Sequence, residues 1–119
     1  MQTVFIDGSG PGWICILFEN GSALLTKERV SSHNEAEWKA LYFALEHLKP
    51  DLSYLILTDS QLVAFQFNGV YKTRSPKIRY LKDGCYDLIG KKGLNVRVKW
   101  IPRYKNRAGE ILESIMKGG

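Results

Sequence analysis

The sequence predicts an α/β fold built on a five-stranded mixed sheet with helices on both faces. The chain opens with three strand-like segments separated by turn signals, changes to helical periodicity, and then alternates two further strand-like segments with helices. Strands joined by short turns pair antiparallel, whereas strands reached through a helix are added in parallel. The expected sheet is therefore an antiparallel three-strand meander plus two parallel strands.

The meander is predicted from two turns. Residues 2–7 are rich in apolar and β-branched side chains, and the corner "GSGPG" separates them from a second apolar segment at residues 13–19. Asn20-Gly21 is a strong hairpin signal, and it leads into a third strand within residues 22–30.

The remaining elements follow from the spacing of apolar residues. Apolar side chains recur every three to four residues between residues 34 and 48, which predicts a helix that Ser32 or Asn34 caps and Pro50 ends. The later elements expected are a buried strand at residues 54–58, helices from Ser60 and over residues 76–89, an alternating strand over residues 94–100, and a closing helix over residues 106–116.

Length and composition restrict the class of protein. The 119 residues suit one domain, 1–119. The net charge of +5 favours a polyanionic partner such as nucleic acid. No apolar run is long enough to span a membrane and no secretion signal is recognisable, so we expect an intracellular, monomeric protein. Cys15 and Cys85 lie far apart in apolar segments, which predicts buried reduced thiols.

Four acidic residues occupy unusual places. Asp7 ends the first strand, Asp59 follows the buried strand, and Glu37 lies on the apolar face of its helix. Glu110 lies early in the closing helix. Clustered carboxylates repel one another unless cations neutralise them, and oxygen ligands suit Mg²⁺ or Mn²⁺. Two such ions about 4 Å apart can drive phosphodiester hydrolysis.

Each of these acids also has a purely structural explanation. Asp7 fits a turn residue, Asp59 fits a helix N-cap together with Ser60, and Glu37 fits a first-turn carboxylate that favours the helix dipole. Glu110 fits a solvated helix residue. Taken one at a time, these positions do not decide between structure and chemistry.

Four segments, in order, resemble the motifs of type 1 ribonuclease H: "FIDGS", "HNEAEWKAL", "ILTDSQLVAFQFNGVYK" and "IPRYKNRAGEILE". The resemblance covers essentially the whole chain and is closest to compact forms without a basic protrusion. It implies a ribonuclease H-like fold and a metal-dependent endonuclease that cuts the RNA strand of an RNA–DNA hybrid with two divalent cations, Mg²⁺ or Mn²⁺.

The resemblance also implies roles for individual residues. By position, the catalytic, metal-binding carboxylates are Asp7, Glu37, Asp59 and Glu110. The expected nucleic-acid-binding residues are Gly8, Ser9, Asn34, Ser60, Gln61, Lys72, Arg74, Arg103 and Asn106. Lys72 and Arg74 belong to the stretch "YKTRSPKIRY", in which basic and aromatic side chains alternate in a manner suited to phosphates and sugars.

The sequence departs from the family pattern at three points. The fourth acid is glutamate at Glu110 where aspartate is usual, and Glu113 follows one turn later as a weaker candidate. The loop after Asp7 is short. No histidine lies in "WIPRYKNR", where many members have one, and Arg103, Tyr104 or Lys105 are its possible substitutes. Two alternatives therefore stay open: a nucleic-acid-binding module with weak or lost catalysis, and a related nuclease acting on double-stranded RNA.

Overall fold

The computed structural model describes residues 1–118, and this part of the chain contains the predicted mixed sheet and its helices. The strands are β1 (Gln2–Gly8), β2 (Trp13–Phe18), β3 (Ala23–Lys27), β4 (Ser53–Thr58) and β5 (Asn95–Trp100). The α-helices are α1 (His33–Glu46), α2 (Gln61–Phe67), α3 (Pro76–Lys92) and α4 (Arg107–Gly118), and a short 3₁₀ turn, η1 (Arg103–Lys105), precedes α4. No helix among these is long and apolar enough to cross a membrane.

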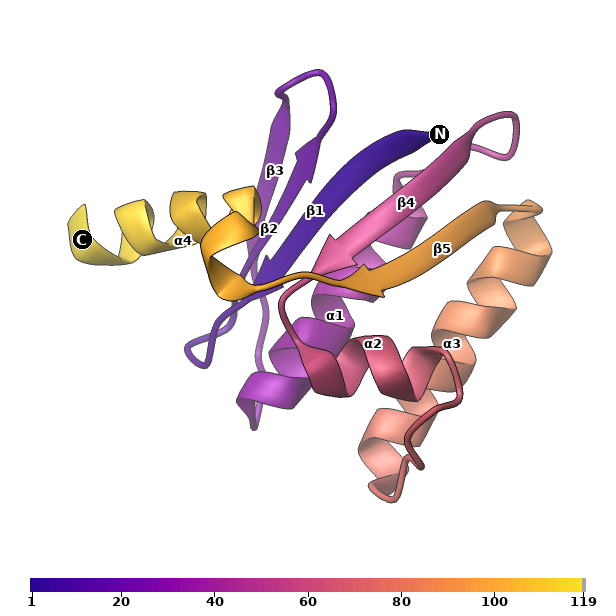
Figure 1. The fold of residues 1–119 in the computed structure, drawn as a ribbon. Helices are drawn as coiled ribbons and strands as arrows, with labels where there is room; N and C mark the ends of the chain where they lie inside the picture. The colour runs from indigo at the N-terminus through magenta and orange to yellow at the C-terminus, as the bar shows by residue number, and fades with distance from the viewer. Residues whose placement is uncertain (119) are drawn as a thin grey trace.

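The order of strands across the sheet is β3-β2-β1-β4-β5 (Figure 1). Pairing is antiparallel between β1 and β2 and between β2 and β3, and parallel between β1 and β4 and between β4 and β5. The predicted fold class is therefore confirmed. Because β1 and β4 are adjacent and parallel, their carboxyl ends lie side by side at one edge of the sheet, where ligands bind in many α/β folds.

The two faces of the sheet bury different helices. One set of alternating side chains packs with α1, α2 and α3, and it includes Val4, Ile6, Ile14, Ile16 and Ile56. The opposite set, which includes Cys15 and Leu17, packs against Ala108 and Leu112 of α4. Figure 1 shows α4 apart from the other three helices, beside β1 and β2. The period of two along each strand thus divides the core between the two layers of helices.

Both cysteines are buried free thiols, as predicted. Burial raises the pKa of Cys85 to about 12, and burial together with the charge of Asp7 raises the pKa of Cys15 to about 11. These thiols pack as small apolar side chains.

Serine hydroxyls cap three helices. Ser32 Oγ accepts a hydrogen bond from the Glu35 amide at 3.1 Å, so Ser32 rather than Asn34 caps α1. Ser60 Oγ accepts one from the Val63 amide at 3.1 Å, so Ser60 rather than Asp59 caps α2. Ser75 caps α3. Because Ser60 satisfies the helix terminus, the carboxylate of Asp59 is free to point elsewhere.

Gly8 marks the closest approach of β1 to α1. A Cβ atom at this position would lie 2.5 Å from the carbonyl carbon and oxygen of Ala36. These are backbone atoms of a packed helix, which cannot move aside cheaply. Glycine at position 8 therefore allows the end of β1 to touch the first turns of α1, which brings Asp7 close to Glu37.

Replacing Gly8 with alanine should destabilise the protein by about 2–4 kcal/mol, because β1 and α1 must separate to admit the methyl group. Urea unfolding monitored by circular dichroism measures this change. Gly10→Ala is the matched control, since no described atom lies within 4 Å of a Cβ at that position. Equal unfolding midpoints for the two variants would contradict this account of the contact.

Candidate active site

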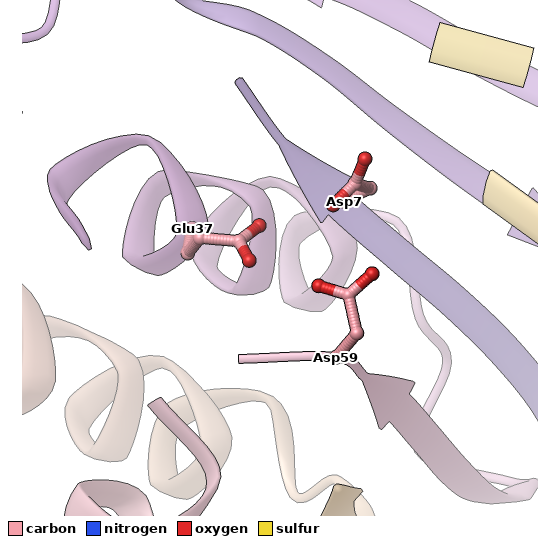
Figure 2. Close-up of side chains that lie close together, drawn as sticks. All are labelled: Asp7, Glu37 and Asp59. Atoms are coloured by element: carbon pink, nitrogen blue, oxygen red, sulfur yellow. The ribbon is translucent and has the colours of Figure 1, made fainter. Parts of the chain in front are cut away.

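Three carboxylates from three elements converge beside the carboxyl ends of β1 and β4. Asp7 comes from β1, Glu37 from the second turn of α1, and Asp59 from the residue that follows β4 (Figure 2). One oxygen of each lies within 4.8 Å of the others. The sequence prediction that these side chains meet is correct, and their meeting depends on the parallel pairing of β1 with β4 and on the packing of α1 against β1.

Burial makes this cluster electrostatically costly. Asp7 is 2% exposed and Glu37 is 4% exposed. Burial, with the nearby charge of Asp59, raises the pKa of Asp7 to about 6 even though Arg103 and His33 favour its ionised form. Burial and the charges of Asp7 and Asp59 raise the pKa of Glu37 well above its usual range, against the Gly8 amide that donates a hydrogen bond to it. Neighbouring carboxylates taken out of water are stabilised by a proton or by a nearby cation.

Arg103 supplies positive charge at the centre of this cluster. Its Nη1 lies 3.1 Å from both carboxylate oxygens of Asp7 and 2.8 Å from Oδ2 of Asp59. Its Nη2 lies 3.3 Å from Oε1 of Glu113 on α4. Partial burial disfavours the charged guanidinium, but the hydrogen bonds and charges of Asp59 and Asp7 outweigh this and raise the pKa of Arg103. The sequence assigned Arg103 to nucleic acid, whereas the structure places it among the acids.

Asn106 ties the start of α4 to the sheet. It is fully buried, and its Nδ2 donates to the carbonyl of Ile6 at 2.9 Å and to Oδ2 of Asp59 at 3.1 Å. Its Oδ1 accepts from the amides of Ala108 and Gly109. Because these bonds use its amide within the chain, Asn106 positions Asp59. Its contact with nucleic acid, expected from the sequence, stays a prediction.

The two glutamates of α4 differ in their relation to the site. Glu110 is exposed and lies outside the group formed by Asp7, Glu37 and Asp59 among residues 1–118. Glu113, one turn later, contacts Arg103 and lines the same cavity as Asp7. The role of Glu110 as fourth metal ligand is therefore still a prediction, and Glu113 is the acid of α4 that the fold connects to the site.

The other residues expected to bind nucleic acid are placed around the site or farther along the surface. The Gly8 amide donates to Glu37, and the Ser9 hydroxyl closes the turn by accepting from the Trp13 amide at 3.0 Å. Ser60 caps α2, and Gln61 is exposed at its first turn. Gly8 and Ser9 directly follow Asp7 in the chain, and Ser60 and Gln61 directly follow Asp59. All of them except Gln61 use polar groups in hydrogen bonds within the chain.

Asn34, Lys72 and Arg74 complete this set. Asn34 is partly exposed in the first turn of α1, and its Oδ1 is buried without a hydrogen-bond partner among the described residues. Lys72 and Arg74 are exposed in the segment between α2 and α3. Their assignment to nucleic acid stays a prediction.

Comparison with known proteins agrees with this geometry. Residues 6–112 match the family described as reverse transcriptase-like. The chain belongs to this family of ribonuclease H-like domains. LC11-RNase H1, a protein isolated from compost by a metagenomic approach and crystallised in complex with an RNA/DNA hybrid, is 27% identical to it. The similarity covers 99% of both chains, with a TM-score of 0.84.

Two further structures share the fold at lower identity. RNase H1 from the halophilic archaeon Halobacterium salinarum NRC-1 is 21% identical over 99% of this chain and 98% of its own, with a TM-score of 0.78. The N-terminal RNase H domain of Rv2228c from Mycobacterium tuberculosis is 18% identical over 98% and 96%, with a TM-score of 0.73.

The ribonuclease H-like domain has a cavity of about 340 Å³ next to Asp7, and His33 lines it. His33 was not among the predicted site residues, although it lies four residues before Glu37 and therefore on the same face of α1. A larger cavity of about 750 Å³ lies between α1 and α3, and no carboxylate of the three-acid cluster lines it. Of these two cavities, the smaller one is lined by a member of the cluster, Asp7, together with Arg103 and Glu113.

The acid cluster suits a hard divalent cation. Its ligand atoms are all carboxylate oxygens, they converge from rigid elements, and the structure itself brings a positive group, the Arg103 guanidinium, to them. Oxygen-only sites of this kind are typical of Mg²⁺ and Mn²⁺. Asp7, Glu37 and Asp59 are thus the residues that would hold such an ion.

Asp7→Asn should stabilise the metal-free protein at pH 7 by about 1–3 kcal/mol, because it removes a buried repulsive charge. The pKa of Asp7 is about 6 in the folded chain, compared with an ordinary value of 3.8. The folded chain therefore binds this proton more tightly than the unfolded chain does. Its contribution to stability is therefore complete below pH 3.8 and is lost as the pH rises through 6. Urea unfolding in EDTA across this range measures the effect.

The variant should lose this pH-dependent decline, whereas Asp51→Asn, which alters an exposed acid, should keep it. Parallel stability profiles for wild type and Asp7→Asn would show that Asp7 is not strained by burial.

Proposed function

We propose that this ribonuclease H-like domain is a metal-dependent endonuclease that hydrolyses the RNA strand of RNA–DNA hybrids. The convergence of Asp7, Glu37 and Asp59 within 4.8 Å carries the proposal, because it offers a divalent cation three oxygen ligands at an accessible edge of the sheet. The similarity over the whole chain to LC11-RNase H1, which was crystallised with a hybrid, supports the choice of substrate.

The carboxylates of Asp7, Glu37 and Asp59 would hold two Mg²⁺ or Mn²⁺ ions, with Glu110 as the fourth acid. When bound, the ions supply Lewis-acid activation of the scissile phosphodiester. Asp7 comes from β1, which pairs with β4 and packs against α1, so Asp7 would be a ligand close to both Glu37 and Asp59. Asn106 holds Asp59 in its orientation, and the Gly8 amide holds Glu37. These hydrogen bonds keep the ligands in place before a cation binds.

Recognition of the hybrid depends on its backbone and groove shape. Lys72 and Arg74 offer exposed positive charges for phosphates. Asn34 and Gln61 offer amide groups within three residues of Glu37 and Asp59 in the chain. Contacts of this kind do not read base sequence. A domain that binds as a monomer through such contacts should cut without strong sequence preference.

A second candidate function is hybrid binding with weak or lost catalysis. The exposed position of Glu110, outside the group of three acids, favours this alternative because a complete site needs its fourth ligand. Cleavage assays separate the two functions, and a panel that includes double-stranded RNA tests the other nuclease alternative.

A labelled hybrid incubated with Mg²⁺ or Mn²⁺ should be cleaved in its RNA strand and should stay intact in EDTA. Asp7→Asn and Asp59→Asn should each lower the cleavage rate by about 10³-fold or more, because each removes a ligand that stabilises transition-state charge. Gel electrophoresis of timed reactions measures both effects. Asp51→Asn serves as the charge-matched control. An intact hybrid after long incubation with both metals, together with measurable binding, would favour the binding module.

Lys72→Gln and Arg74→Gln should each weaken binding of the hybrid and reduce the slope of log Kd against log salt concentration by about one, because each removes a phosphate contact. Fluorescence anisotropy in EDTA measures binding without cleavage. Lys49→Gln removes an equal charge from an exposed site beside Gln2, at the opposite end of β1 from Asp7. If all three variants share one slope, the segment between α2 and α3 does not touch the backbone.

A further inference from the structure

We propose that Arg103 is a resident counter-cation that competes with divalent metal for Asp7 and Asp59, so that metal binding requires its guanidinium to leave the cluster. This inference deepens the proposed function and rests on it in expecting a divalent cation at these acids. It concerns the control of metal affinity, and it assigns Arg103 a role within the metal site instead of a direct contact with nucleic acid.

Arg103 contacts both Asp7 and Asp59 through the same nitrogen atom. A single nitrogen, Nη1, lies 3.1 Å from both oxygens of Asp7 and 2.8 Å from Oδ2 of Asp59. A divalent cation held by Asp7 would compete for oxygens that already accept hydrogen bonds from the guanidinium, as does Oδ2 of Asp59. Charge-assisted hydrogen bonds of this length are strong, and a second cation beside the guanidinium would be repelled. Guanidinium and metal therefore exclude each other at this position.

Arg103 has a route out of the cluster, whereas the acids do not. The Arg103 side chain is 51% exposed, while that of Asp7 is 2% and that of Asp59 is 9% exposed. The guanidinium can turn into solvent without unfolding the chain, and Glu113, itself 55% exposed, already binds its other nitrogen at 3.3 Å. Glu113 thus gives the displaced guanidinium a partner at the rim of the site.

Gly109 leaves space for this arrangement. A Cβ atom at position 109 would lie 2.9 Å from Nη1 of Arg103 and 3.4 Å from Oδ2 of Asp7. Glycine within a helix costs stability relative to alanine. Its presence here lets the first turn of α4 lie against the ion pair without a side chain that would press on the guanidinium.

The test is Mn²⁺ binding to the full chain without substrate, measured by isothermal titration calorimetry. Arg103→Gln should bind Mn²⁺ about tenfold or more tightly than wild type, because no charge-assisted hydrogen bonds have to be broken first. Arg103→Lys keeps the positive charge but in a smaller ammonium group that cannot form the same fork of hydrogen bonds. Its affinity for Mn²⁺ should therefore lie between those of wild type and Arg103→Gln. Thermal unfolding of each variant in EDTA and in Mn²⁺ gives a second readout, and Arg103→Gln should show the larger rise in Tm on adding metal.

Lys105→Gln is the matched control, since Lys105 lies in the same 3₁₀ turn, is exposed and lies 5.9 Å from the Tyr104 ring centroid. It should bind Mn²⁺ within about twofold of wild type, because exposed charges are screened. Unchanged or weaker Mn²⁺ binding by Arg103→Gln would overturn the inference, while cleavage of hybrid by wild type would leave the proposed function standing. Failure of every variant to bind Mn²⁺ would overturn both the inference and the metal-dependent mechanism.

Discussion

Repulsion among three buried carboxylates is the constraint on which the rest of this site depends. Asp7, Glu37 and Asp59 lie within 4.8 Å of one another, and burial raises the pKa of both Asp7 and Glu37. A folded domain tolerates such a group when protons or positive charge offset the repulsion. In the structure that charge comes from Arg103, and in the proposed active form it comes from divalent cations. The same carboxylates thus pair with a guanidinium in the structure and with divalent cations in the proposed active form.

The fold holds the three carboxylates on rigid elements. Parallel pairing places the ends of β1 and β4 together, and glycine at position 8 lets α1 approach closely enough to add Glu37. Asn106 links the start of α4 to β1 and to Asp59. Each acid is therefore fixed by an element that the hydrophobic core holds, so electrostatic strain cannot relax by moving the backbone.

Much of this could be predicted from local sequence patterns. Turn signals and apolar periodicity predicted the meander and the helical crossovers, because these patterns report which residues face a core. The placement of Asp7 and Asp59 followed from their position at the ends of two strands. The cap of α2 could not be assigned between Asp59 and Ser60, since both residue types accept hydrogen bonds from helix amides. Only the observed Ser60 bond to Val63 settles it.

The sequence by itself determined the order of elements and the type of sheet, because periodicity and strand ends are local properties of the chain. It also indicated that Asp7, Glu37 and Asp59 belong to one site. Tertiary structure alone decided the partners of Arg103, whose bonds to Asp7 and Asp59 span 96 and 44 residues. It likewise placed Glu113 rather than Glu110 beside the site. The helix phase of α4 and the direction of a long flexible side chain depend on packing against the sheet, and no local pattern encodes them.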